Sequence, residues 1–356
     1  MLENWLKAGK VDGELASWQF GKNIVHFEDE FPDLKEVKVA LIGTGKEVDS
    51  IRKQLYELAY PFGKMTIADI GNLRKANEAF LLPVIRELLD NNIIPIILSH
   101  KALPFAAQFK AYQNSRKSVN VAVIGESTPF HSEATNYLSN ISTSKIPSLE
   151  NLGLIGYQTH LTPPETINFY QKKNYDLVRL GKAKSNMEAV EPTLRAADTV
   201  YFNMNALKYI EAPGLWKNSP SGFSSEEACQ LAHYAGMSDK LTSIGFYGYH
   251  AKKDKSQQTA QLIAHIIWYL LEGIYNRKRD FPVSTDGMIE YIVSFKDYDH
   301  NATFWKSTKS GRWWMQMDSN TNKGKHELVP CTYEDYQMAC KDELTARVLN
   351  VLERYT

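Results

Sequence analysis

The spacing of hydrophobic residues changes in a regular way along this chain. After residue 35, short runs of aliphatic and β-branched residues alternate with longer segments whose apolar residues recur every three to four positions. A run of the first kind is typical of a strand buried on both faces, and a segment of the second kind is typical of an amphipathic helix. The alternation predicts an α/β fold, in which helices cover both faces of a parallel sheet.

Eight strands and several helices can be placed from this pattern. Residues 256–275 are predicted to form a long helix with one apolar face, and residues 48–59 and 75–90 are predicted to form two more. Ser224 and Glu227 have the spacing of a capping box, which predicts that another helix begins there. The predicted strands are 37–43, 65–70, 93–98, 119–125, 152–157, 177–180, 199–203 and 241–247.

The alternation ends near Asp280, where a turn-rich segment, FPVSTDG, follows. Beyond it we expect short antiparallel strands at 289–295, 303–307 and 312–317, and one or two helices within 333–353. The predicted organisation is a leader of residues 1–35 that packs on the core, an α/β domain of residues 36–280, and a C-terminal extension of residues 281–356.

Charge and composition narrow the classes of function. Lys plus Arg and Asp plus Glu number 41 each, so the chain lacks the excess positive charge on which nucleic-acid and anionic-membrane binding depend. The longest strongly apolar run, 93–98, is too short to cross a bilayer, and the N-terminus has no signal-peptide core. The three cysteines form no CxxC pair. We therefore expect a cytoplasmic protein that is not inserted into a membrane and binds small molecules or proteins, but not nucleic acid.

Several short motifs occur in a fixed order along the chain. The motifs are DSIRKQLY (49–56), ADIGN (68–72), IPIIL (94–98), YFNMNAL (201–207), APG (212–214), GFSSEEA (222–228) and TAQL (259–262). Together they resemble the ureohydrolase family of arginase, agmatinase and formiminoglutamase, from near residue 36 to near residue 278. The resemblance implies a three-layer αβα fold with a mostly parallel eight-stranded sheet and a two-manganese site at the carboxyl ends of strands.

The acids that would hold those metals differ in this chain. Asn203 and Asn205 stand at two aspartate positions of the family motif, and Lys208 stands at a third. Two adjacent divalent ions repel each other and need several carboxylates, whereas an amide oxygen carries no charge and a lysine adds a positive one. Lys208 could fill part of a vacated cation site or point to solvent. We therefore expect no cofactor and assign no catalytic residue; Mn²⁺ is expected only if the chain is a divergent enzyme.

Residual ligands stand at other motif positions of the resemblance. Glu126 and His131 occupy the place of DAHxD, and His100 follows the strand that leads to GGDH in the family. Two histidines and a carboxylate suit Zn²⁺ or Fe²⁺. These three residues could therefore form a different metal site; the alternative is that they are ordinary surface or loop-capping residues. His250 stands near the place of a substrate-holding glutamate. The vestigial cleft is predicted to contain Asn203, Asn205, Lys208, Glu126 and His250.

Tryptophans concentrate in the C-terminal extension. Trp305, Trp313 and Trp314 lie close in sequence to Arg312, a composition typical of interface hot spots. These four residues are a candidate partner surface; the alternative is that they pack the extension onto the main domain. The extension resembles that of formiminoglutamase-like proteins of certain bacteria, which suggests a bacterial source.

Three functions follow as alternatives. The first is a non-catalytic ureohydrolase homologue, a pseudoenzyme, that binds an unidentified protein partner as a scaffold, with the extension as the candidate contact; the resemblance also implies a homo-oligomer. The second is a divergent metal-dependent formiminoglutamase or amidinohydrolase that hydrolyses a linear C–N amidine bond. The third is a small-molecule sensor, in which Lys208 and the two asparagines bind a polar ligand in the vestigial cleft without turnover.

Overall fold

Runs rich in apolar residues form most of the long strands of the central sheet, as expected for strands covered on both faces. The structure, a computed structural model, describes residues 2–9, 13–101, 105–116, 118–127, 148–217, 219–282, 284–295, 301–318 and 326–355. The long strands are β3 (Val39–Gly43), β4 (Ile67–Leu73), β5 (Ile94–Ser99), β6 (Ser118–Ile124), β7 (Ser148–Tyr157), β8 (Asp176–Arg179), β9 (Thr199–Asn203) and β10 (Ser243–Tyr247). They pair in parallel in the order β4-β3-β5-β10-β9-β6-β7-β8, which confirms the predicted parallel sheet.

The N-terminal segment adds two short strands to this sheet. The strand β1 (Leu6–Lys7) pairs antiparallel with β4, and β2 (Val25–His26) pairs parallel with it. Leu6 and Phe20 are fully buried against the neighbouring elements. Within the described part of the chain the sheet therefore has ten strands instead of the eight implied by the resemblance.

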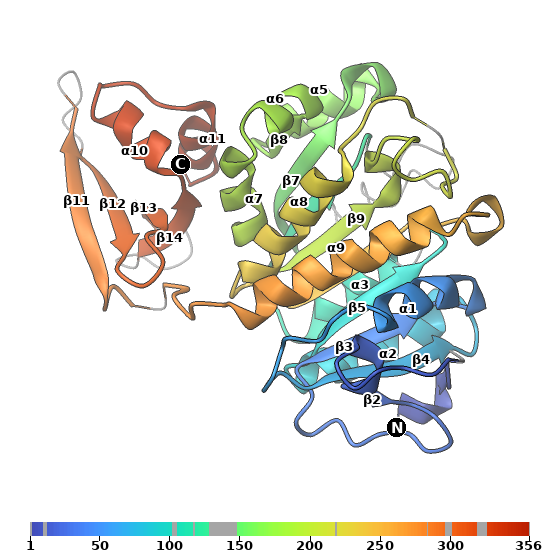
Figure 1. Cartoon of the computed structure of the whole chain (residues 1–356). Coiled ribbons are helices and arrows are strands. Elements are labelled where there is room, and N and C mark those ends of the chain that lie inside the picture. The colour runs from blue at the N-terminus through green and yellow to red at the C-terminus, as the bar shows by residue number, and fades with distance from the viewer. Residues whose placement is uncertain are drawn as a thin grey trace.

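Helices cover both faces of the sheet because successive strand residues point to opposite sides. Val39 and Leu41 of β3 pack into one apolar cluster, and Ala40 and Ile42 pack into the other. The first cluster contains residues of α1 (Asp49–Tyr56), α7 (Glu191–Ala196), α8 (Ser225–Met237) and α9 (Gln258–Tyr275), and the second contains residues of α2 (Glu78–Asp90), α3 (Phe105–Lys110) and α5 (Pro164–Lys172). The three layers are visible in Figure 1, and none of the helices in the described residues is long and apolar enough to span a membrane.

The predicted start of α8 is confirmed at atomic detail. The hydroxyl of Ser224 accepts a hydrogen bond from the backbone N–H of Glu227, and the Glu227 carboxylate accepts one from the backbone N–H of Ser224 at 2.8 Å. This reciprocal pair is the capping box that the sequence indicated. Gly236 of α8 and Gly273 of α9 lie so close that a Cβ on either would clash with the backbone of the other helix.

The extension forms a separate antiparallel sheet with two helices (Figure 1). Its strands are β11 (Met288–Ser294), β12 (Asn301–Ser307), β13 (Trp313–Asp318) and β14 (His326–Cys331), and its helices are α10 (Tyr333–Ala339) and α11 (Ala346–Tyr355). The first three strands and both helices were predicted. The strand β14 was not, because its sequence, HELVPC, contains a proline and shows no clean alternation; pairing with β13 defines it.

The tryptophans expected to form a partner surface are mostly buried, so that prediction needs correction. Trp313 is 7% exposed and Trp314 is 1% exposed. Arg195 of α7 donates hydrogen bonds to the carbonyl oxygens of Trp313 and Cys331 at 3.1 and 3.0 Å, and its guanidinium lies 4.4 Å from the centre of the Trp314 ring. Trp314 therefore packs the extension onto the main domain through the Arg195 guanidinium, whereas the ring of Trp313 packs against Tyr291 and Tyr336 inside the extension.

The other two members of that surface also have partners inside the protein. Arg312 lies within ion-pair distance of Glu191 and Asp280. The indole N–H of Trp305 donates to the side-chain oxygen of Gln316 at 2.9 Å, and the Trp305 side chain is half-buried. Trp305 and Arg312 are both half-buried, so none of the four residues is fully exposed.

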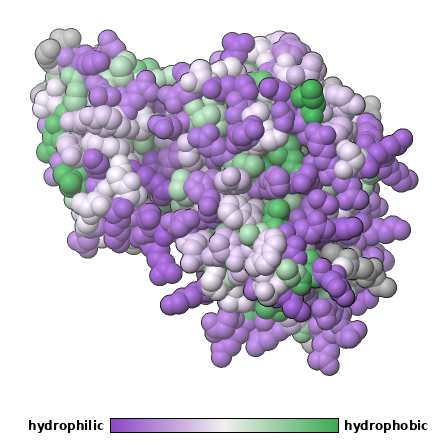
Figure 2. Space-filling model, viewed as in Figure 1, coloured by the Kyte–Doolittle hydropathy of each residue, from purple (hydrophilic) through white to green (hydrophobic). Residues whose placement is uncertain are grey.

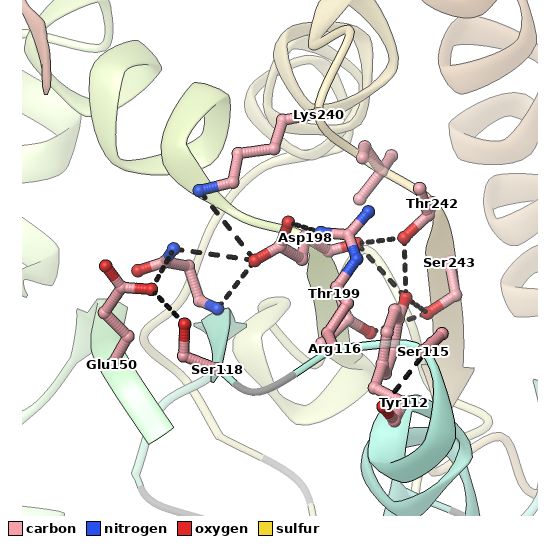
Figure 3. A network of polar contacts seen from close by, with 12 residues as sticks. Tyr112, Ser115, Arg116, Ser118, Glu150, Asp198, Thr199, Lys240, Thr242 and Ser243 are labelled. Carbon is pink, nitrogen blue, oxygen red and sulfur yellow. Dashed lines mark hydrogen bonds and ion pairs between the residues drawn. The ribbon is translucent and has the colours of Figure 1, made fainter. Parts of the chain in front are cut away.

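A polar network, seen in Figure 3, fixes the amino ends of the strands. The predicted site lies at the carboxyl ends of the same strands. Asp198, which is 1% exposed and precedes β9, accepts the backbone N–H of Asn120 at 2.8 Å and forms an ion pair with Arg116. The carbonyl of Asp198 accepts the N–H of Thr242. Through its carboxylate and its backbone carbonyl, Asp198 thus joins the starts of β6, β9 and β10, which aligns their carboxyl ends at the other edge.

Candidate functional site

The predicted site residues lie along one edge of the sheet. Since β5, β10, β9 and β6 are neighbours, the residues that follow them are neighbours too. His100 follows β5, Asn203 ends β9 and Asn205 comes just after it, and Glu126 follows β6. The structure therefore brings together, at adjacent strand ends, positions that are far apart in sequence.

The two asparagines occupy the middle of this edge. The side-chain oxygen of Asn203 accepts the backbone N–H of Asn205 at 3.0 Å and caps the short turn η7 (Met204–Ala206). Gly248, which follows β10, has a φ of +98°, and a Cβ placed there would lie 3.4 Å from the Asn203 side-chain oxygen and 4.0 Å from that of Asn205. Both amide oxygens therefore line the space beside Gly248, but only that of Asn205 is buried without a partner among the described residues.

On the β5 side of the asparagines, Trp216 joins the backbone of His100 to the ring of His250. The indole N–H of Trp216 donates to the backbone carbonyl of His100 at 2.6 Å, and its ring lies 4.2 Å from the ring of His250. Burial lowers the pKa of His100, Glu47 opposes this effect, and Lys101 and His250 add to it. The His100 imidazole is thus harder to protonate than one in water, and its Nδ1 atom is buried and unpaired within the described chain.

A buried carboxyl group lies on the β6 side. Glu126 is 4% exposed, and its backbone carbonyl accepts the N–H of Gln158 at 2.7 Å. Burial raises the pKa of its carboxyl, while the nearby Lys217 and His160 side chains lower it. Glu126 is therefore a carboxyl group that is easier to protonate than one in water.

Lys208 is drawn towards the start of α8. Its backbone N–H donates to the carbonyl of Phe223. The pKa of the Glu226 carboxyl is lowered by a hydrogen bond from the Glu226 backbone and by one from Ser224. The ammonium of Lys208 lowers this pKa further. No described contact joins Lys208 to Asn203 or Asn205, so its predicted place between the vacated metal positions gains no support from the geometry.

The side chains at this edge do not fit a pair of manganese ions. The oxygen of Asn203 is already committed to the backbone, and the described residues contain no group of three His, Cys, Asp or Glu side chains that could hold a metal. His100 and Glu126 follow strands that are separated by β10 and β9. His131, the other ligand proposed from the sequence, lies outside the described residues. Neutral amides cannot offset the charge of two divalent ions.

Several residues of the site were not predicted from the sequence. Trp216 connects His100 to His250, and Lys217 and His160 set the electrostatic surroundings of Glu126. Trp216 follows the APG motif closely, which could have drawn attention to it. Nothing in the sequence marks Lys217 or His160, because their relevance depends on distance to Glu126 in the folded chain.

The fold and this edge can now be compared with known proteins. No protein-family model matches the chain, and no curated protein matches its sequence. Among solved structures, formimidoylglutamase from Bacillus subtilis is similar with a TM-score of 0.62 and 15% identity, covering 76% of this chain and 96% of that one. Formiminoglutamase from Trypanosoma cruzi, solved with Mn²⁺, gives a TM-score of 0.62 at 12% identity, with 69% and 95% covered. Arginase from Bacillus subtilis gives 0.56 at 16%, with 66% and 98% covered.

The chain therefore has the fold of the formiminoglutamases and arginases, as the sequence motifs predicted. The low identities establish the fold and leave the activity open. The similarity extends over nearly the whole length of each matched structure, so it concerns the complete ureohydrolase-like domain of those proteins. The Mn²⁺ in the Trypanosoma cruzi structure contrasts with the amide-containing edge described above.

Proposed function

We propose that this protein is a non-catalytic member of the ureohydrolase fold group that acts by binding. The observation that carries the proposal is the state of Asn203 and Asn205: two neutral amides stand at the centre of the strand-end site, and one is committed to a backbone hydrogen bond. An edge of this chemistry cannot ionise a metal-bound water through paired divalent ions, because it lacks the required negative charge. A protein partner, a homo-oligomeric state, a cytoplasmic location and a bacterial source belong to the same proposal.

A metal titration tests this function directly. Purified chain would be titrated with Mn²⁺ by calorimetry, then analysed for metal after gel filtration and assayed for release of urea, formamide or ammonia from arginine, agmatine and formiminoglutamate. A manganese formiminoglutamase serves as positive control. We expect no stoichiometric binding and no product. Two bound equivalents together with turnover would refute the proposal.

A divergent hydrolase is a second candidate, supported by the manganese-containing formiminoglutamase neighbour. Glu126 supports it further, because a buried carboxyl group at a strand end is suited to act as a ligand or an acid. Under this hypothesis Glu126→Gln abolishes the turnover measured in the same assay, whereas Glu165→Gln on the surface helix α5 leaves it unchanged. The two candidates therefore predict different results from one set of measurements.

Ligand binding without turnover is a third candidate, and two atoms favour it. The side-chain oxygen of Asn205 and Nδ1 of His100 are buried without partners among the described residues, and unpaired buried polar atoms are costly unless something completes them. A thermal-shift screen of amino acids and other polar metabolites would test this role. A stabilising compound should lose its effect in Asn205→Leu and keep it in Asn276→Leu, a matched change distant in the fold.

A further inference from the structure

The strand β11 forms an open edge of the C-terminal sheet. It pairs with β12 along all seven of its residues, and no described residue pairs with its other side. In Figure 1 it lies at the outer margin of the molecule, away from the central sheet. Its outer backbone groups are therefore available to another strand.

The hydrogen-bond register identifies those groups. The backbone N–H of Thr308 donates to the carbonyl of Gly287 at 3.0 Å, next to the paired residues Met288 and Ser307. Bonded and non-bonded pairs alternate in an antiparallel ladder, so the odd-numbered residues of β11 point their N–H and C=O groups towards β12. The even-numbered residues point theirs outward; they are Met288, Glu290, Ile292 and Ser294. Of these, Met288 already donates its N–H to the carbonyl of Thr285 at 3.1 Å and offers only its carbonyl to a new strand.

Glu290 supplies the only charge that protects this edge against pairing. The sequence MIEYIVS contains no proline and no lysine, which commonly block edge strands. Ile292 is 61% exposed and Ile289 is 46% exposed. Apolar surface is visible along the margin of the space-filling view where β11 lies (Figure 2). A long and apolar edge of this kind favours addition of a further strand.

We propose that β11 pairs antiparallel with β11 of a second copy of this chain, around a two-fold axis at Tyr291. In this register Glu290 lies opposite Ile292 of the partner subunit, and Met288 lies opposite Ser294 of the partner subunit. Glu290 and Ile292 exchange both of their ladder hydrogen bonds with the partner copy. Ser294 donates its N–H to the carbonyl of Met288 of the partner subunit, and the N–H of Met288 is already bonded to Thr285. The two four-stranded sheets become one continuous sheet.

The side chains of β11 complement their own copies in this arrangement. On the face covered by α10, Ile289 lies opposite Val293 of the partner subunit, and Tyr291 lies opposite the same residue of its copy. Glu290 is the only charged residue of the strand, and the register places it opposite an isoleucine instead of another carboxylate. A two-fold axis at Glu290 would place the two carboxylates opposite each other, and the axis at Tyr291 avoids this like-charge contact.

A charge-exchange experiment on the full chain tests both the surface and the register. Sedimentation equilibrium would measure the dimer dissociation constant of the wild type, of Ile292→Glu, and of Ile292→Glu combined with Glu290→Lys. The single change places a second carboxylate opposite Glu290 in both symmetry-related pairs and should weaken the dimer by about tenfold. The double change places a lysine opposite each new carboxylate and should recover most of that loss.

Two controls make each outcome decisive. Ile210→Glu changes an isoleucine that is 78% exposed on the main domain, and it should leave the dissociation constant unchanged. Hydrogen exchange at Glu290 and Ile292 should slow as the wild-type concentration rises. A wild type that stays monomeric over a hundredfold concentration range overturns the proposal, even if it binds extended peptides at β11. A dimer whose dissociation constant is unchanged by Ile292→Glu also overturns the proposal.

Discussion

The side-chain oxygen of Asn203 accepts the backbone N–H of Asn205 at 3.0 Å, so one amide of the strand-end site shapes the loop that carries the other. This bond is a capping interaction at the start of η7. The position of Asn205, with its buried unpaired oxygen, depends on it. Asn203 therefore has a structural role even where a metal-binding role is absent.

The capping role predicts different effects for two substitutions of Asn203. Asn203→Asp retains an oxygen that accepts the Asn205 N–H, and it should change the free energy of unfolding by only a few tenths of a kcal/mol. Asn203→Ala removes the acceptor and should cost about 1 kcal/mol. Urea unfolding followed by circular dichroism would measure both. Equal destabilisation by the two variants would contradict the capping role.

Glu126 should make the stability depend on pH. Burial raises the pKa of its carboxyl in the folded state above the value in the unfolded chain, so the folded state binds this proton more tightly. The stability that Glu126 contributes is therefore fully present at low pH. It declines as the pH rises from about 4.3, the ordinary pKa of glutamate, to the raised pKa of the folded state.

Glu126→Gln should remove that decline. Unfolding free energies measured by urea titration between acidic and neutral pH would show the variant gaining on the wild type as the pH rises. Glu165→Gln on the surface of α5 is the matched control. Its unfolding free energy should change with pH in the same way as that of the wild type. A constant wild-type-minus-variant difference across this range would mean that the carboxyl of Glu126 is not desolvated.

Arg195 should be essential for attachment of the extension. Arg195→Met removes two hydrogen bonds to backbone carbonyls of β13 and β14 and the contact with the Trp314 ring. We expect a loss of about 3 kcal/mol, because buried carbonyls lose a charged donor. Hydrogen exchange by mass spectrometry should show faster exchange in residues 313–318 and 326–331.

The control for that experiment is Lys341→Met, an exposed change in the same extension. It should leave both exchange and stability unchanged. Faster exchange spread evenly over the central sheet in Arg195→Met would argue against a local undocking and for global destabilisation.

Asp198 should stabilise the amino ends of three strands. Asp198→Asn weakens the ion pair with Arg116 and turns one acceptor into an N–H₂ group facing donors, including the backbone N–H of Asn120 (Figure 3). We expect a loss of about 2–3 kcal/mol in urea unfolding. Glu150→Gln changes an exposed carboxylate of the same network and should cost less than about 1 kcal/mol.

Much of the fold could be predicted because its signals are local. The eight parallel strands were visible as continuous apolar runs, and Ser224 with Glu227 marked the start of α8, since both patterns depend on neighbouring residues. The strand β14 was missed because its sequence has no clear strand pattern, and only its pairing with β13 identifies it as a strand. The short strands β1 and β2 were missed for the same reason. Two residues are too few to show a periodicity, and the pairing of these strands with β4 exists only in the folded chain.

The candidate site shows the same division. The sequence alone determined which residue types stand at the strand ends: the amides of Asn203 and Asn205, the carboxyl of Glu126 and the imidazole of His100, because these follow recognisable strands. Only the tertiary structure decided which of their atoms are free, since Asn203 is committed to a backbone N–H and Asn205 is not. It also decided that Trp313 and Trp314 face inward while β11 stays open. Burial and pairing depend on segments distant in sequence, and no local pattern encodes them.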